Sequence, residues 1–177
     1  MTIWTIGHST RSAAEFIELL QREQVEVLVD VRRFPGSRKY PHFSGDALKA
    51  SLPVAGIDYI HLPALGGRRA ARPDSPNTAW RNDAFRGYAD YMETAEFLVG
   101  FRELTAIAQI RRTAIMCAEA VWWRCHRGLV ADLLKVEGWE VLHIFDKKVE
   151  LHPFTGAARV VDGKLTYAAE EAQPSLL

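Results

Sequence analysis

The residues whose side chains are best suited to take part in a reaction fall within one stretch, residues 113–127. It reads TAIMCAEAVWWRCHR. It contains both cysteines of the chain, Cys117 and Cys125, together with Glu119 and His126. Thiolates are nucleophiles and soft metal ligands, and carboxylates and imidazoles transfer protons. The stretch therefore offers four candidate catalytic groups close together in the chain.

Cys125 is the better placed cysteine for reactivity. Arg124 and Arg127 flank it, His126 follows it, and an apolar pattern at helical spacing begins directly afterwards. We expect Cys125 to lie in the first turn of this helix. The helix dipole and the neighbouring cations would then favour the thiolate, so we predict a lowered pKa for Cys125. The alternative is a thiol that simply packs beneath the loop.

Cys117 closes an apolar run, 114–116, that is typical of a buried strand. It is either a small hydrophobic side chain of the core or a nucleophile at the strand's carboxyl end. A phosphatase or sulfurtransferase loop would close with an arginine at the sixth position after the cysteine. That position is Trp123, and Arg124 comes one residue later, so the spacing disfavours such a loop.

A metal site is a further alternative for the same side chains. If a metal binds at all, its ligands would be Cys117, Cys125 and His126, which suit zinc or iron. Adjacent residues point in different directions on a helix, however, and the surrounding arginines oppose a cation. We therefore predict no resident metal or other cofactor, and we keep a reversible Cys117–Cys125 disulfide as an open alternative.

Strands alternate with helices along the chain. Runs rich in β-branched and apolar residues at 3–6, 25–31, 57–62, 114–116 and 141–145 are separated by segments with helical periodicity. This alternation predicts a single α/β domain over 1–177, with a mostly parallel central sheet flanked by helices. The Asp162-Gly163 pair adds a small C-terminal β-hairpin, within an appendage at about 149–168.

Capping residues predict where several helices begin. Ser12 with Glu15 three residues later forms a capping box. Ser44 and Thr94 are N-cap residues for two later helices.

Polar and basic residues follow the first four predicted strands. In parallel sheets ligands bind beyond the carboxyl ends of the strands, so these residues form one candidate site. They are His8, Ser9, Asp30, Arg32, Arg38, Gly66, Gly67, Arg68, Cys117, Glu119, Cys125, His126 and Arg127.

Arginine dominates this set, and its planar fork suits phosphate. We expect Arg32, Arg38, Arg68 and Arg127 to bind a phosphate-bearing ligand. Ser9, Asp30, Gly66 and Gly67 would complete the anion-binding and substrate-binding surface. Aromatic residues in or beside the same loops could stack on a base; they are Phe34, Tyr40, Trp80, Trp122 and Trp123.

Three further residues have two readings each. His8 is a general acid or base, or a hydrogen-bonded turn residue. Glu119 is a general base, or the buried partner of Arg127. Asp30, at the end of a central strand, is expected to orient Arg32 or to cap a neighbouring loop, because a buried carboxylate needs a partner.

The amino-acid composition excludes several classes of protein. Equal numbers of basic and acidic residues, 22 each, give no net charge and so no global attraction to nucleic acid or membrane. Two cysteines make no disulfide framework. No signal peptide or membrane-spanning run is apparent, so we expect a cytoplasmic protein that does not bind membranes. The sequence does not indicate an oligomeric state.

Several motifs resemble a known family. TIGHS, VDVRRFPGSR, LPALGGRR, and MCAE followed by CHR resemble the bacterial family called domain of unknown function 488 (DUF488), from residue 6 to residue 167. The resemblance implies a compact cytoplasmic α/β domain and supplies no reaction, substrate or cofactor. Most of the candidate residues above are its signature residues. The stretch Val121-Trp122-Trp123 departs from the family, whose loop there is often more polar.

Three functions remain open at this stage. The leading hypothesis is an enzyme acting on a phosphate-bearing substrate, a nucleotide or nucleic acid, with Cys117, Glu119, Cys125, His126 and His8 as the catalytic set. The second is a non-catalytic nucleotide-binding or nucleic-acid-binding module. The third is a redox-responsive or metal-responsive protein built on the cysteine pair.

Overall fold

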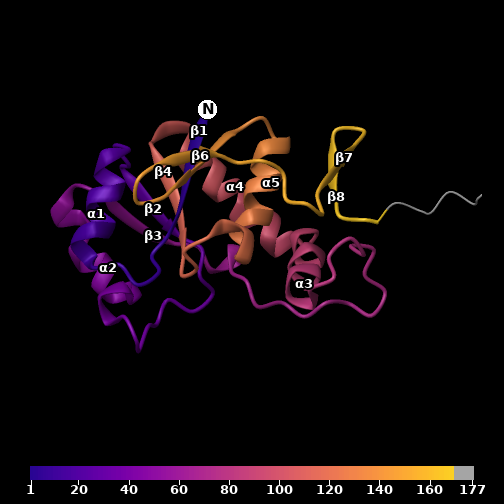
Figure 1. Ribbon diagram of the computed structural model, residues 1–177, viewed down its shortest axis with the longest axis horizontal. Coiled ribbons are helices and arrows are strands. Elements are labelled where there is room, and N and C mark those ends of the chain that lie inside the picture. The colour runs from indigo at the N-terminus through magenta and orange to yellow at the C-terminus, as the bar shows by residue number, and fades with distance from the viewer. Residues whose placement is uncertain (170–177) are drawn as a thin grey trace, which may run out of the picture.

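A computed structural model describes residues 1–169 and has a sheet between two layers of helices (Figure 1). The main sheet has the strand order β3-β2-β4-β1-β5-β6, in which β6 alone runs antiparallel. Its strands are β1 (Thr2–Gly7), β2 (Val27–Asp30), β3 (Asp58–His61), β4 (Thr113–Cys117), β5 (Glu140–Ile144) and β6 (Val149–Leu151). A separate hairpin pairs β7 (Arg159–Val161) with β8 (Lys164–Thr166). The predicted fold class is confirmed.

Within residues 1–169, five α-helices flank the sheet, and the caps of three of them follow the predictions. They are α1 (Ala13–Arg22), α2 (Gly45–Ser51), α3 (Asp83–Met92), α4 (Ala95–Ile110) and α5 (Arg127–Val136). Ser12 and Glu15 form the capping box of α1, and Ser44 and Thr94 cap α2 and α4. Asn82 caps α3, which the sequence did not indicate.

Alternating side chains divide the core into two parts. On β4, Ala114 and Met116 pack with α1 and α2, whereas Ile115 and Cys117 pack with α3, α4 and α5. The helices accordingly lie on opposite faces of the sheet, α1 and α2 on one and α4 and α5 on the other (Figure 1). Burial on both faces explains why the central strands are almost wholly apolar.

The adjacent strands β1 and β4 lead to opposite faces. The chain leaves β1 for α1 on one face and leaves β4 for α5 on the other. Neighbouring strands with divergent connections open a crevice at their carboxyl ends. Two backbone hydrogen bonds hold the segment after β1 against the end of β4, at the base of this crevice. His8 N–H donates to Cys117 O and Ser9 N–H donates to Ala118 O, both at 2.9 Å.

The start of α5 corrects one prediction. The helix begins at Arg127, with His126 as its N-cap, after a short 3₁₀ turn at Trp122–Arg124. Cys125 therefore does not lie in the first helical turn but in an extended conformation, with φ −134° and ψ 145°. The turn packs by tertiary contact, because the Trp122 ring stacks on His143 with centroids 4.8 Å apart. A local pattern in the sequence does not reveal that contact.

The long segment before α3 is fastened to that helix. Asp90 is buried and accepts hydrogen bonds from Ser75 Oγ, Asn77 Nδ2 and the backbone N–H of Arg72, at 2.5, 2.9 and 2.8 Å. These bonds lower the pKa of Asp90, against the opposing effect of burial. The segment therefore has a defined path against α3.

Candidate functional site

A cavity of about 810 Å³ lies at the carboxyl edge of the sheet. We call it the edge cavity. Its walls come from the segments that follow β1, β2, β3 and β4 and from the start of α3. Of the predicted site residues, those that line it are His8, Ser9, Arg32, Gly67, Arg68, Cys117, Glu119, Cys125 and His126.

Cys117, Cys125 and His126 meet in the wall of the edge cavity and form what we call the sulfur–imidazole cluster. His126 Nδ1 lies 3.9 Å from Cys117 Sγ and 3.7 Å from Cys125 Sγ. The three atoms all lie within 4.8 Å of one another. Both cysteines are free thiols and buried. The sequence could not show that the two cysteines meet, and the fold brings them together.

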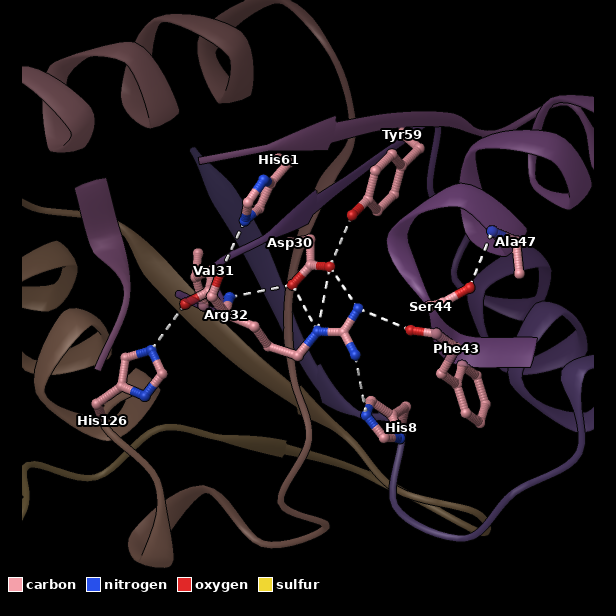
Figure 2. Close-up of polar contacts among 10 residues, drawn as sticks. All are labelled: His8, Asp30, Val31, Arg32, Phe43, Ser44, Ala47, Tyr59, His61 and His126. Atoms are coloured by element: carbon pink, nitrogen blue, oxygen red, sulfur yellow. Dashed lines mark hydrogen bonds and ion pairs between the residues drawn. The ribbon is translucent and has the colours of Figure 1, made fainter. Parts of the chain in front are cut away.

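A backbone carbonyl fixes the tautomer of His126. Its Nε2 lies 3.0 Å from Val31 O, and a carbonyl only accepts, so Nε2 carries the hydrogen. Figure 2 shows this bond beside the end of β2. The other ring nitrogen, Nδ1, faces the two sulfur atoms.

The predicted lowering of the Cys125 pKa is wrong. Burial raises the pKa of the Cys125 thiol well above its usual value, and its hydrogen bond to Cys117 adds to the effect. The pKa of Cys117 is lowered, first by that hydrogen bond and then by His126 and Arg127. Burial outweighs the charge and the backbone N–H of Arg127, which both act to lower the pKa of Cys125. The first negative charge therefore resides on Cys117.

Asp30 holds Arg32 in place, as the sequence indicated. Arg32 Nη2 lies 2.6 Å from Asp30 Oδ2 in a buried ion pair, and the same nitrogen donates to Phe43 O at 2.9 Å. Tyr59 also donates to Asp30, at 2.8 Å. Figure 2 shows that these bonds occupy most of the guanidinium. Only Nη1 remains directed elsewhere, toward His8 Nε2 at 3.3 Å.

His8 is a neutral, buried ring. Its Nδ1 donates to Ser9 O at 2.9 Å, and its Nε2 accepts from Arg32 (Figure 2). Burial lowers the pKa of His8, and the charge of Arg32 lowers it further. The ring stacks on Phe43, with centroids 4.4 Å apart. His8 thus connects the Asp30–Arg32 pair with the edge cavity.

Three exposed arginines line the edge cavity: Arg33, Arg68 and Arg124. Among residues 1–169 none of them forms an ion pair with a carboxylate. Glu119 is the acidic side chain on the same wall, and it is exposed. The wall therefore carries an excess of positive charge.

Two of the predicted phosphate-binding arginines lie elsewhere. Arg38 is exposed and does not line the edge cavity. Arg127 is 2% exposed and donates from Nη2 to Ala120 O at 2.8 Å. Glu119, being exposed, is not the buried partner of Arg127 that the sequence suggested. Arg127 instead holds the turn after β4 and lowers the pKa of Cys117 by its charge.

Gly66 and Gly67 are required by close packing and not by backbone conformation. Neither has a positive φ angle. A Cβ atom on Gly66 would lie 2.7 Å from the Arg33 backbone, and one on Gly67 would lie 2.7 Å from His126 Nδ1. Gly67 therefore allows the chain to approach the sulfur–imidazole cluster closely.

The aromatic residues divide into two groups. Phe34 and Tyr40 line the edge cavity, as do Phe85 and Tyr88 from α3, which the sequence analysis missed. The predicted Trp80, Trp122 and Trp123 pack elsewhere, against Tyr167, His143 and Phe145 respectively.

A second polar cluster, which the sequence analysis missed, lies beneath the turn at Trp122. We call it the buried histidine network. His143 Nδ1 lies 2.7 Å from Thr5 Oγ1, His143 Nε2 lies 2.8 Å from His152 Nδ1, and His152 Nε2 lies 3.0 Å from Asp132 Oδ1. Burial, with the charges of His152 and Arg127, lowers the pKa of His143 to about 2.

Asp132 is the fixed end of this network. Besides His152, it accepts from the backbone and the hydroxyl of Thr155, at 2.8 and 2.6 Å, and from Tyr167 Oη at 2.9 Å. Four donors satisfy the carboxylate, which is fully buried. These contacts fasten the segments on either side of the hairpin to α5.

No curated protein and no solved structure matched this chain. Within residues 1–169, no helix is both long enough and apolar enough to cross a bilayer. One family model does match, over residues 12–134, and its description is a domain of unknown function, DUF488. The match covers the arginine loops, both cysteines and most of α5, while the His8-Ser9 pair precedes it. The chain belongs to the DUF488 family.

Proposed function

We propose that the protein is an enzyme that acts on a phosphate-bearing substrate, a nucleotide or nucleic acid, bound in the edge cavity. One observation carries this proposal. Three exposed arginines, which have no carboxylate partner among residues 1–169, line the same cavity as the sulfur–imidazole cluster, at the carboxyl edge of the sheet. The arginines supply binding, and the cluster supplies reactive groups.

The charge of the wall favours an anion. Arg33, Arg68 and Arg124 outnumber Glu119 there, and a guanidinium fork matches two oxygen atoms of a phosphate. Arg33 also donates to Arg68 O at 3.1 Å, which holds two of the cationic loops together. A preformed cationic wall reduces the entropy lost when the ligand binds.

The size and the aromatic lining favour a nucleotide over inorganic phosphate. A cavity of about 810 Å³ lies within the usual range of small-molecule sites. Phe34 is 64% exposed and lies beside Arg33, with the guanidinium carbon 5.4 Å from the ring centroid. An exposed aromatic ring next to a phosphate-binding cation can stack on a base.

The reactive groups support an enzyme more than a passive binding module. A binding module needs the arginines and the aromatic rings, but it has no use for two thiols and an imidazole packed together in the same wall. His8 and Glu119 offer further proton-transfer groups on that wall. The proposed catalytic set therefore remains Cys117, Cys125, His126, His8 and Glu119.

Binding and turnover can be tested together. The ligands are AMP, ADP, ATP and a single-stranded thymidylate octamer. Calorimetry measures affinity at two salt concentrations, and mass spectrometry measures consumption of each compound. We expect at least one compound to bind with steep salt dependence and to be consumed. Arg68→Ala should weaken this binding, whereas Arg102→Ala, an exposed arginine of α4 outside the cavity, should not.

The outcomes separate the alternatives. Binding that depends on Arg68 without consumption of any compound would favour the non-catalytic module. No binding by any of the four compounds, or equal weakening by both arginine substitutions, would contradict the proposal.

A further inference from the structure

We propose that Cys117, Cys125 and His126 bind a zinc ion whose fourth coordination position faces the edge cavity. The inference rests on the geometry of the sulfur–imidazole cluster. Only its final step, the chemistry performed on a substrate, rests on the proposed function.

The two distances from His126 Nδ1 to the sulfur atoms are already close to those of a tetrahedral site. Zinc lies about 2.3 Å from a thiolate sulfur and about 2.0–2.1 Å from an imidazole nitrogen, so ligand atoms lie about 3.5–3.8 Å apart. Here His126 Nδ1 lies 3.7 Å from one sulfur and 3.9 Å from the other. The three atoms lie within 4.8 Å of one another. Side-chain shifts of a few tenths of an ångström would bring both nitrogen–sulfur distances to the values expected around zinc.

His126 is oriented as zinc-binding histidines are. Such a histidine donates its second ring N–H to a carboxylate or a carbonyl, which fixes the ring and leaves the other nitrogen free for the metal. His126 Nε2 lies 3.0 Å from Val31 O, and Nδ1 faces the sulfur atoms. Val31 follows β2 directly, so the central sheet holds this acceptor in place.

The backbone explains how two adjacent residues act as ligands together. Side chains of consecutive residues diverge on a helix, which argued against a metal. Cys125 is extended, with φ −134° and ψ 145°, whereas His126 has φ −57° and ψ −21° as the N-cap of α5. This change of conformation between the two residues directs both side chains to Cys117.

The surrounding arginines also cease to be an obstacle once charges are counted. Two thiolates cancel the two positive charges of Zn²⁺, so the loaded cluster has no net charge. A cationic wall would repel free Zn²⁺ but does not oppose the assembled neutral site.

Three protein ligands are typical of a catalytic zinc, whereas structural sites have four. Within residues 1–169 no fourth cysteine, histidine or carboxylate joins the group. All three ligands line the edge cavity. A water in the fourth position would be acidified by the metal. Hydroxide from that water would form a bond to phosphorus of a phosphate-bearing substrate, and the bond from phosphorus to the departing oxygen would break. The water's proton would leave with that departing group.

Native mass spectrometry of the full chain tests the site. The protein is purified in reductant without chelator and measured before and after addition of one equivalent of Zn²⁺. We expect about one zinc per chain, which is released when an organomercurial titrates the thiols. Cys125→Ser and Cys117→Ser should each lower the zinc content at least about 10-fold. His42→Gln, outside the cluster, should leave it unchanged.

The contrary results are equally clear. A wild-type protein that stays zinc-free after the addition would overturn the proposal. So would a mass two hydrogens lighter that persists in reductant, which indicates a disulfide, or zinc retained by both cysteine variants. Circular dichroism establishes that each variant is folded. Arg68→Ala should keep its zinc, so loss of nucleotide binding and loss of the metal can be told apart.

Discussion

The sulfur–imidazole cluster and the buried histidine network differ in how fully their polar atoms are satisfied. Both combine residues of α5 or its N-cap with residues that follow or belong to a central strand. In the network, each histidine nitrogen and each oxygen of Asp132 has a protein partner. In the cluster, His126 Nδ1 and both sulfur atoms face one another beside a cavity.

The difference teaches which of two similar groups of side chains serves structure. A closed set of hydrogen bonds has no remaining capacity for a ligand, and breaking it leaves buried polar atoms unpaired. A set with free lone pairs beside a cavity can exchange one partner for another. Substitutions in the network should therefore affect stability, and substitutions in the cluster or its cavity should affect binding and chemistry.

The largest expected effect comes from Asp132→Ala. It removes the acceptor of four buried donors and should lower the free energy of unfolding by about 3–5 kcal/mol. Urea denaturation measures the loss. Asp132→Asn, which keeps one acceptor oxygen, should lose less. If Asp132→Ala left stability within about 0.5 kcal/mol of wild type, the network would not have the structural role assigned to it.

Acid should destabilise the protein through His143. Its pKa is about 2 when folded and 6.5 ordinarily. Between these values the unfolded chain binds a proton that the folded chain does not, so stability falls as pH drops below 6.5. The slope is about 1.4 kcal/mol per pH unit. In urea melts from pH 7 to pH 4.5, His143→Gln should show a shallower decline than wild type. Parallel declines would contradict the assigned shift.

Arg68→Ala should separate binding from stability. Loss of one charge-assisted pair should weaken binding of ADP by about 1.5–3 kcal/mol, at least tenfold. The side chain is exposed and has no ion pair among residues 1–169, so the unfolding free energy should change by less than about 0.5 kcal/mol. A large loss of stability with unchanged affinity for ADP would contradict this account. It would mean that Arg68, in the wall of the edge cavity, serves stability and not binding.

A much smaller effect on stability than that of Asp132→Ala is expected for Cys125→Ser in the metal-free protein. A hydroxyl replaces a buried thiol of similar shape, and the unfolding free energy should change by about 1 kcal/mol or less. The comparison is made in chelator, by thermal and urea melts, with Cys117→Ser alongside. A loss approaching that of Asp132→Ala would mean that the cluster, too, is chiefly structural.

Local signals in the sequence predicted the scaffold well. The capping box at Ser12 and Glu15 and the caps at Ser44 and Thr94 depend on neighbours three residues apart. The turn at Asp162-Gly163 needs two positive φ angles, and both residues have them. The parallel sheet followed from the alternation of elements, and it correctly indicated the edge where the cavity lies.

Contacts between distant elements could not be predicted in the same way. The network joins Thr5, Asp132, His143 and His152 across β1, α5, β5 and the segment after β6, and no short spacing connects them. The position of Cys125 depends on the stacking of Trp122 on His143. Whether Arg33 or Arg38 lines the cavity depends on the path of an irregular loop, which local pattern does not determine.

Hydrogen–deuterium exchange with and without ADP tests the central claim most directly, because it locates a ligand as well as detecting it. Binding in the edge cavity should slow exchange in the segments 8–12, 32–37, 66–69 and 117–127, and leave 140–152 unchanged. Slower exchange in 140–152 alone, or no change in the four cavity segments at a concentration of ADP that saturates binding, would contradict it.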